Sequence, residues 1–423
     1  MPTSTDEAAG QALAVAHALI DPERVTAALT APAAATLCDG LAGTALLHAC
    51  LARTDPQFAT AATQHWEAAA RLGRRTQPDG IHTGPGALAA SLVVGTGYLP
   101  DPGPYGDIAR NATAWLSARA EGLARHQQQR TAQGRPGAPW AVYDAIKGLA
   151  GIGRVLLAAH AAGHREQAQP GLTATLTTLT AILRARHGRR PGWWLPAEDH
   201  PPPVTVHPSG AATTGLAHGA AGPLALLAIA HTAGHTVPGQ AEGIRTTATW
   251  LTTHRDADGT WPPHISGDAL DHPPTPGLPS PSGRRDAWCY GTPGIGRALT
   301  LAGQALTDPA LTAAGRTAVD RFAERRSATW DTEGPTLCHG TAGILQAATR
   351  GDSPAVAAQA AQLTTAFHDP DRPFGFPHIE SEARFDNPGF LTGAAGTALA
   401  LADYTGLLPT CPAAAWDSLL LLS

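Results

Sequence analysis

The stretch Cys338-His339-Gly340-Thr341-Ala342-Gly343 is a glycine-rich turn that leads directly into an apolar run predicting a helix. The same pattern occurs seven times along the 423 residues, at 38–43, 82–86, 147–151, 215–222, 289–294, 338–343 and 391–396. Amphipathic stretches with helical spacing separate the copies, at 60–72, 108–125, 172–186, 240–254, 311–325 and 356–368. Each repeat therefore predicts a pair of helices.

Repeated helix pairs can stack into an open solenoid or close into a ring. The helices that follow the turns, such as 44–52, 223–231 and 343–349, carry almost no charge, as inner helices do. An open solenoid needs polar terminal copies, whereas the first and last copies here are as apolar as the middle ones. We therefore expect an all-α fold, a closed α/α toroid with a double ring of helices, in a single domain over residues 1–423.

Two of the turns carry soft metal ligands. Cys289 lies in one turn, and the adjacent Cys338 and His339 lie in another. Two thiols and one imidazole suit zinc, and three protein ligands leave a coordination position open for water or substrate. The pattern indicates a reactive metal site rather than a structural one.

An unremarkable interpretation applies to the cysteines as well. Free cysteine is often a small buried apolar residue, and we assign Cys38, Cys50 and Cys411 to that class. The tight Cys-x-x-Cys signature of structural zinc sites does not accompany Cys289 or Cys338, so spacing alone leaves both interpretations open for them.

Three long proline-rich stretches, 187–210, 257–286 and 369–389, each precede a glycine turn. Long loops in compact domains usually form lids or binding loops, and we expect these to lie over the metal site. Polar residues of the last stretch are candidates for substrate contact, namely His378, Glu380, Glu382 and Arg384.

Three motifs together resemble the signatures of the lanthipeptide cyclases, the zinc enzymes that close thioether rings in dehydrated precursor peptides. They are Gly215-Leu216-Ala217-His218-Gly219, Trp288-Cys289-Tyr290-Gly291 and Cys338-His339-Gly340, supported by Tyr143-Asp144 and the segments 258–262 and 389–396. The resemblance covers nearly the whole chain. It implies seven inner and seven outer helices, in agreement with the count of repeats.

The resemblance also assigns residues. Cys289, Cys338 and His339 match the zinc ligands, for one Zn²⁺ per chain; His218 and Asp144 match acid/base positions; Arg285 and Tyr290 match residues that line the active site. The residues taken singly have structural explanations too. His218 could be a hydrogen-bonded core histidine, Asp144 a helix N-cap, and Arg285 a solvated loop residue.

The resemblance implies addition of peptide Cys thiols to dehydroalanine or dehydrobutyrine. The expected partners are a leader-bearing dehydrated precursor peptide and a separate dehydratase. Two alternatives stay open: a family relative that adds glutathione to dehydrated residues, and a non-catalytic scaffold that binds peptides. A helical-ring glycosidase would need paired carboxylates at the mouth, and besides Asp144 the turns carry only Asp39.

Composition narrows the class of protein. A net charge of −5 without a basic cluster argues against nucleic-acid binding. The N-terminal residues lack a secretory signal pattern, and no apolar run approaches the roughly 18 residues of a membrane span. Five cysteines, some of them expected as thiolate ligands, predict the reducing cytoplasm. High Ala, Arg, Thr and Pro content suggests a GC-rich bacterial genome.

Overall fold

The structure is a computed structural model that describes residues 4–73, 79–272, 286–411 and 413–423. These residues are mostly helical, which confirms the predicted helical class. Strands in the described residues are short and form two-stranded antiparallel pairs. Arg285, which was predicted to line the active site, and the rest of segment 273–285 lie outside the described residues.

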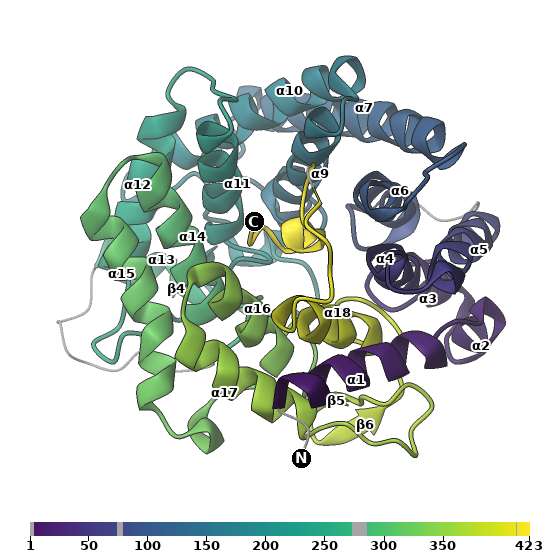
Figure 1. Cartoon of the computed structure of the whole chain (residues 1–423). Coiled ribbons are helices and arrows are strands. Elements are labelled where there is room, and N and C mark those ends of the chain that lie inside the picture. Colours follow the sequence, from purple (N-terminus) through teal and green to yellow (C-terminus); the bar gives the residue numbers. More distant parts are fainter. Residues whose placement is uncertain (1–3, 74–78, 273–285, 412) are drawn as a thin grey trace.

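The helices that begin at the glycine turns form an inner set. They are α4 (Leu41–Leu51), α6 (Gly84–Gly95), α9 (Leu149–Ala161), α11 (Ala221–Thr232), α14 (Thr292–Ala305), α16 (Thr341–Gly351) and α18 (Ala394–Tyr404). Each contacts the next in this order, and α18 contacts α4 (Figure 1). Every residue of α4 is buried, as its apolar composition predicts.

A second set of helices packs outside the first (Figure 1). In chain order they are α5 (Pro56–Gly73), α7 (Tyr105–Ala132), α10 (Arg165–Arg184), α12 (Gln240–Thr253), α15 (Pro309–Asp320) and α17 (Pro354–Thr365), each on the inner helix that precedes it. Their buried residues recur at helical spacing, as with Phe58, Ala62 and Trp66 in α5. The last inner helix, α18, differs because its partner is the N-terminal helix α1 (Ser4–Ala18).

The remaining elements are short. The helices are α2 (Pro22–Ala27), α3 (Ala31–Ala34), α8 (Trp140–Tyr143) and α13 (Gly267–Asp271), with 3-10 turns η1 (Thr96–Tyr98), η2 (Ala197–Asp199), η3 (Arg321–Glu324), η4 (Ser327–Thr329) and η5 (Trp416–Leu420). The strands are β1 (Arg186–His187) with β2 (Arg190–Pro191), β3 (Ala211–Thr213) with β4 (His264–Ser266), and β5 (His378–Glu380) with β6 (Ala383–Phe385). The long loops therefore contain short pairing segments that their proline content did not predict.

The C-terminal segment occupies the middle of the inner helices (Figure 1). Its residues Leu419–Leu422 are buried. Its backbone carbonyls accept hydrogen bonds from side chains of two inner helices and one turn: Arg154 Nε to Ser423 O (2.8 Å), Arg297 Nε to Leu422 O (2.8 Å) and Trp288 Nε1 to Leu420 O (2.9 Å). This segment fills the core that the inner helices surround.

The last glycine of every turn packs against the backbone. A Cβ at this position would lie closer than 3.0 Å to the carbonyl oxygen six residues earlier, which real Cβ atoms do not tolerate. The positions are Gly43, Gly86, Gly151, Gly222, Gly294, Gly343 and Gly396. Glycine at this position thus allows each inner helix to pack closely against the turn that precedes it.

Backbone hydrogen bonds of 2.9 to 3.1 Å join each turn to the next. The N–H to carbonyl pairs are Cys38 to His82, Ile81 to Ile146, Ala145 to Ala217, Ala217 to Cys289, Cys289 to Cys338, Cys338 to Leu391, and Leu391 to Cys38. The series returns to its first member. It brings turns that are far apart in sequence to one end of the inner helices.

Candidate metal centre

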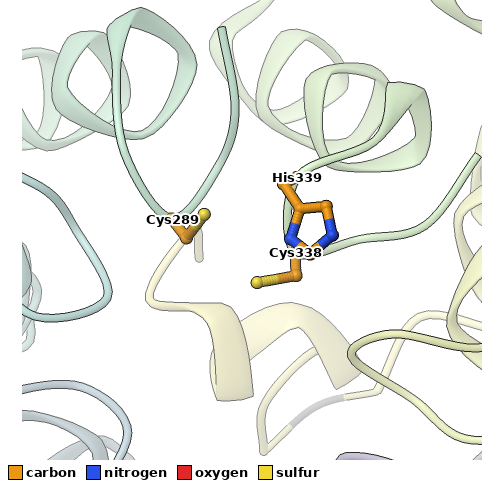
Figure 2. Close-up of side chains that lie close together, drawn as sticks. All are labelled: Cys289, Cys338 and His339. Atoms are coloured by element: carbon orange, nitrogen blue, oxygen red, sulfur yellow. The ribbon is translucent and has the colours of Figure 1, made fainter. Parts of the chain in front are cut away.

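Cys289 and Cys338 occupy the same position in consecutive turns, two residues before the first glycine of each turn. The Cys289 N–H donates to the Cys338 carbonyl at 3.1 Å, which places the two side chains side by side. His339 follows Cys338, and one donor atom from each of the three residues lies within 4.8 Å of the others (Figure 2). Among the described residues, no other such group of three or more metal-ligating side chains gathers.

The cluster favours a thiolate. A hydrogen bond from the Cys338 side chain lowers the pKa of Cys289 from its ordinary value of 9.0, and the neighbouring His339 adds to this, against the opposing effect of burial. Zinc holds its sulfur and nitrogen ligands at about 2.0–2.3 Å, so donors around one ion lie roughly 4 Å apart. The chemistry and the spacing of these three donors both fit a zinc ion.

Glu333 lies beside His339, the candidate ligand. The Glu333 backbone N–H donates to the His339 carbonyl at 2.8 Å, and the Glu333 carboxylate lies 3.7 Å from His339 Nε2. A carboxylate beside a ligating imidazole is a common way to orient it. Glu333 was not predicted from the sequence, although it lies only a few residues before the Cys338-His339 motif.

His218 and Asp144 form a second group at the same end of the inner helices. The Nδ1 of His218 lies 2.6 Å from Asp144 Oδ2, and the carboxylate is fully buried whereas a quarter of the imidazole is exposed. The other oxygen, Oδ1, accepts hydrogen bonds from the N–H groups of Ile146, Lys147 and Gly148 at 3.1, 2.7 and 2.9 Å. Asp144 therefore orders the turn before α9 and contacts His218, but it is not the N-cap of α9 that the sequence suggested, because that position is taken by Gly148.

Tyr290 lies close to both groups. It directly follows Cys289, and its ring lies 6.2 Å from the ring of His218. Burial raises the pKa of Tyr290 well above its ordinary value, and the nearby Cys289 and Asp144 raise it further. The phenol therefore stays protonated and can donate a hydrogen bond.

Tryptophan and tyrosine side chains of α8 fix His218 in place. The Trp140 ring stacks on the His218 imidazole at 4.6 Å and 14°. The Tyr143 hydroxyl donates to the His218 carbonyl at 2.9 Å. Trp140 was missed because only its position, three residues before the Tyr143-Asp144 motif, distinguishes it from a core aromatic residue.

Each of the three long loops places one imidazole near these groups. His200 lies 5.7 Å from Trp140, His264 lies 6.2 Å from Tyr290, and His378 lies 5.8 Å from His339, measured between ring centroids. Burial lowers the pKa of His264 to about 4, with further lowering by His200 and His218, so it is neutral near pH 7. Neither His200 nor His264 was singled out from the sequence.

The other candidates do not belong to the Cys289–Cys338–His339 group. Glu380, Glu382 and Arg384 belong to the β5–β6 hairpin and are exposed. Of the three cysteines assigned to the core, Cys50 is fully buried, while Cys38 and Cys411 are partly buried. None of these three belongs to the metal cluster.

The sequence matches the family model of the lanthionine synthetase C-like proteins over residues 31–420. No curated protein matches it. Among solved structures, a nisin cyclase superposes with a TM-score of 0.72 over 92% of this chain and 93% of that chain, at 19% sequence identity. At this identity the likeness establishes a shared fold.

Proposed function

The chain belongs to the lanthionine synthetase C-like family, and from this premise we propose that it is a zinc-dependent lanthipeptide cyclase. The family membership confirms the resemblance seen in the motifs. The observation that carries the proposal is the meeting of two thiols and an imidazole with a separate His218–Asp144 pair at one end of the inner helices. The reaction is the addition of a peptide Cys thiol to a dehydrated residue, which forms a lanthionine or methyllanthionine ring.

The fold proposed for the whole chain is a closed α/α toroid of seven inner and seven outer helices in a single domain, residues 1–423. The contacts from α4 through α18 and back to α4 support it, as do the hydrogen bonds that join the turns. In this arrangement α1 serves as the outer helix of the last copy.

Cys289, Cys338 and His339 would hold one zinc ion, with a fourth position open to the substrate. When bound, zinc supplies a Lewis acid that lowers the pKa of a peptide thiol and makes it a nucleophile at neutral pH. The two protein thiolates would balance the charge of the ion, and Glu333 would orient His339.

His218 is placed to deliver a proton. After the sulfur has added to the β-carbon of dehydroalanine or dehydrobutyrine, the α-carbon of the resulting enolate requires one. Asp144 Oδ2 accepts the hydrogen bond of His218 Nδ1, which leaves Nε2 as the nitrogen for proton transfer. Trp140 holds the ring in this orientation by stacking.

Tyr290 can stabilise the negative charge that develops on the amide oxygen during addition. Its raised pKa keeps the hydroxyl protonated, so it donates rather than repels. Arg285, four residues before Cys289 in sequence, is proposed for the same task on the basis of the motif alone.

The alternatives make different predictions about substrate and product. A relative that adds glutathione would use the same ligands and would leave a heavier peptide. A non-catalytic scaffold has no need of the ordered His218–Asp144 pair or of the complete donor set, and both are present here. We therefore favour the cyclase.

The proposed partners are a dehydrated, leader-bearing precursor peptide and a separate dehydratase. The proposed location is the cytoplasm of a bacterium, because thiol ligands require a reducing compartment. None of the described helices combines the length and the apolar character that crossing a membrane requires.

The test uses a synthetic peptide with one dehydroalanine and one cysteine. We expect the purified protein to carry about one zinc, measured by mass spectrometry of the metal, and to consume the peptide thiol without changing the peptide mass. His218→Ala should abolish ring closure and keep the zinc, whereas Cys338→Ala should lose both while circular dichroism shows an intact helical fold. Turnover unchanged in His218→Ala would reject its role, and absence of zinc from the well-folded wild type would favour the scaffold.

A further inference from the structure

A groove of about 780 Å³ lies between the helices α2 and α3 on one side and the β5–β6 hairpin on the other. Its volume falls within the range of small-ligand and peptide sites. The lining residues are Arg24, Ala27, Ala28, Leu29, Thr30, Ala33, Pro373, Phe374, His378, Glu380, Phe385, Asp386 and Asn387. No step of the proposed chemistry uses this groove.

The groove lies next to the proposed metal centre. His378, which lines it, lies 5.8 Å from the proposed ligand His339, and Phe385, which also lines it, lies 6.2 Å from His378, measured between ring centroids. One side chain, His378, therefore contacts both the groove and the proposed ligand.

The inner end of the groove is attached to the turns themselves. Asn387 Nδ2 donates to Asp39 Oδ1 at 2.9 Å and to Thr392 Oγ1 at 3.2 Å, and these two residues belong to the first and last glycine turns. Along the wall, Arg24 donates to the Pro373 carbonyl at 2.8 Å and lies over the Phe374 ring. These contacts join the helical wall of the groove to the opposite wall and join Asn387 to the two turns.

The walls are mainly apolar. Ala27, Ala28 and Leu29 face the groove from the helical side, and Phe374 and Phe385 from the hairpin side. Half of the Phe385 side chain, 51%, is exposed, the largest value among the exposed large apolar side chains of the described residues. A single exposed aromatic residue is ordinary, but apolar surface that lines a groove rimmed by polar side chains is a common feature of binding sites.

We propose that this groove binds, in an extended conformation, the apolar segment of the peptide that flanks the reacting cysteine. The inference rests on the proposed function for the identity of the peptide. A flank is the expected occupant because ring closure confines only the segment between the cysteine and its acceptor, and the rest of the chain must leave the metal centre. Covering Phe385 by apolar side chains then adds affinity outside the reacting atoms.

The experiment compares three synthetic peptides with the same dehydroalanine–cysteine pair. One has no flank, one has six apolar residues after the pair, and one has six before it. We expect one flanked peptide to show a KM about tenfold below that of the unflanked peptide, with kcat unchanged. Phe385→Ala should remove most of this advantage and leave the KM of the unflanked peptide and the zinc content as in the wild type.

Two further variants complete the design. Ala28→Glu, at an exposed position on the opposite wall, should remove the advantage in the same way if Phe385→Ala proves unstable. Ile108→Ala is the matched control, because this side chain is 43% exposed but lies on the outer helix α7. It should behave as the wild type with all three peptides.

Failure of this inference can be told apart from failure of the cyclase function. A fluorescent flanked peptide with Ala and Ser in place of the reacting pair should bind the wild type and bind Phe385→Ala about tenfold more weakly, by fluorescence anisotropy. If this peptide binds as expected but none of the reactive peptides is turned over, the cyclase function would be rejected and the groove would still be supported as a peptide-binding site. Turnover with equal KM for all three peptides, or a concentration-dependent dimer that only Phe385→Ala abolishes, would overturn the groove proposal.

Discussion

Cys289 and Cys38 occupy the same place in two copies of the repeat, yet their chemistry is opposite. Each donates its backbone N–H to the carbonyl of the next turn, at 3.1 Å in both cases. The pKa of Cys289 is lowered by the hydrogen bond from Cys338 and by His339, whereas burial and the charge of Asp39 raise the pKa of Cys38 far above its ordinary value. The repeat sets where a side chain lies, and its neighbours set what it can do.

The difference comes from the adjacent copy. The turn joined to Cys289 brings a thiol and an imidazole, while Cys38 has Asp39 beside it and lies 3.9 Å from the Thr392 hydroxyl. Asp39 in turn accepts hydrogen bonds from Asn387 and Thr392. One side of the molecule thus gathers soft donors and the other gathers a hydrogen-bonded carboxylate.

The largest expected effect separates the two cysteines directly. Cys289→Ala should reduce bound zinc from about one per chain to none and abolish ring closure, because two ligands cannot hold the ion tightly. Cys38→Ala should keep both. Metal analysis of the two variants, purified side by side without chelators, checks the difference. Equal zinc in both would remove the basis of the comparison.

A second prediction separates the carboxylates Asp144 and Asp39. Asp144→Asn can still accept the three backbone hydrogen bonds but no longer holds a proton on His218 Nδ1, so turnover should fall about 10²-fold with zinc retained. The pH profile of kcat should also shift, which a purely structural role would not produce. Asp39→Asn is the control and should change turnover less than about threefold. A fall of equal size in both variants would contradict the assignment.

A third prediction concerns thiol reactivity in the zinc-free protein. Because its pKa lies below 9.0, Cys289 is the more ionised thiol near pH 7.5, and its alkylation by iodoacetamide should be at least about tenfold faster than that of Cys38. The Cys289 rate should fall as the pH falls through its lowered pKa. Because the pKa of Cys289 is lower in the folded protein than in the unfolded chain, its thiolate also stabilises the fold. This stabilisation is complete at pH values above the ordinary thiol pKa of 9.0 and is lost as the pH falls to the lowered pKa. Peptide mass spectrometry after timed alkylation gives both rates, and a faster Cys38 would refute the electrostatic argument.

The smallest expected effect is on the free energy of unfolding, and it should be the same for the turn that contains Cys338 and for the turn that contains Cys38. Gly343→Ala and Gly43→Ala each place a Cβ against the carbonyl six residues earlier, so each should lower the free energy of unfolding by about 1–3 kcal/mol. Gly10→Ala in helix α1, where nothing lies within 4 Å, should raise it by roughly 0.5–1 kcal/mol. Denaturant titrations measure all three. If only Gly343→Ala lowered the free energy of unfolding, the two turns would not be structurally equivalent.

The repeat allowed much of the fold to be predicted. Helix pairs follow the turns at 289–294 and 338–343 as expected, because apolar periodicity and glycine spacing are local signals. The pairing of α1 with α18 was not predicted, since it joins the two ends of the chain and leaves no local pattern. The short strands in the proline-rich loops were missed for a related reason: their partners are set by packing around the site.

The sequence by itself determined the number of turns, the position of Cys289, Cys338 and His339 within them, and the family. These depend on residue type and spacing along the chain. Only the tertiary structure decided that Asp144 divides its two oxygens between the turn before α9 and His218, and that His378 lies beside His339 while lining a groove. Such contacts join residues tens of positions apart, and they exist only because backbone hydrogen bonds and helix packing bring separate turns to one end of the molecule.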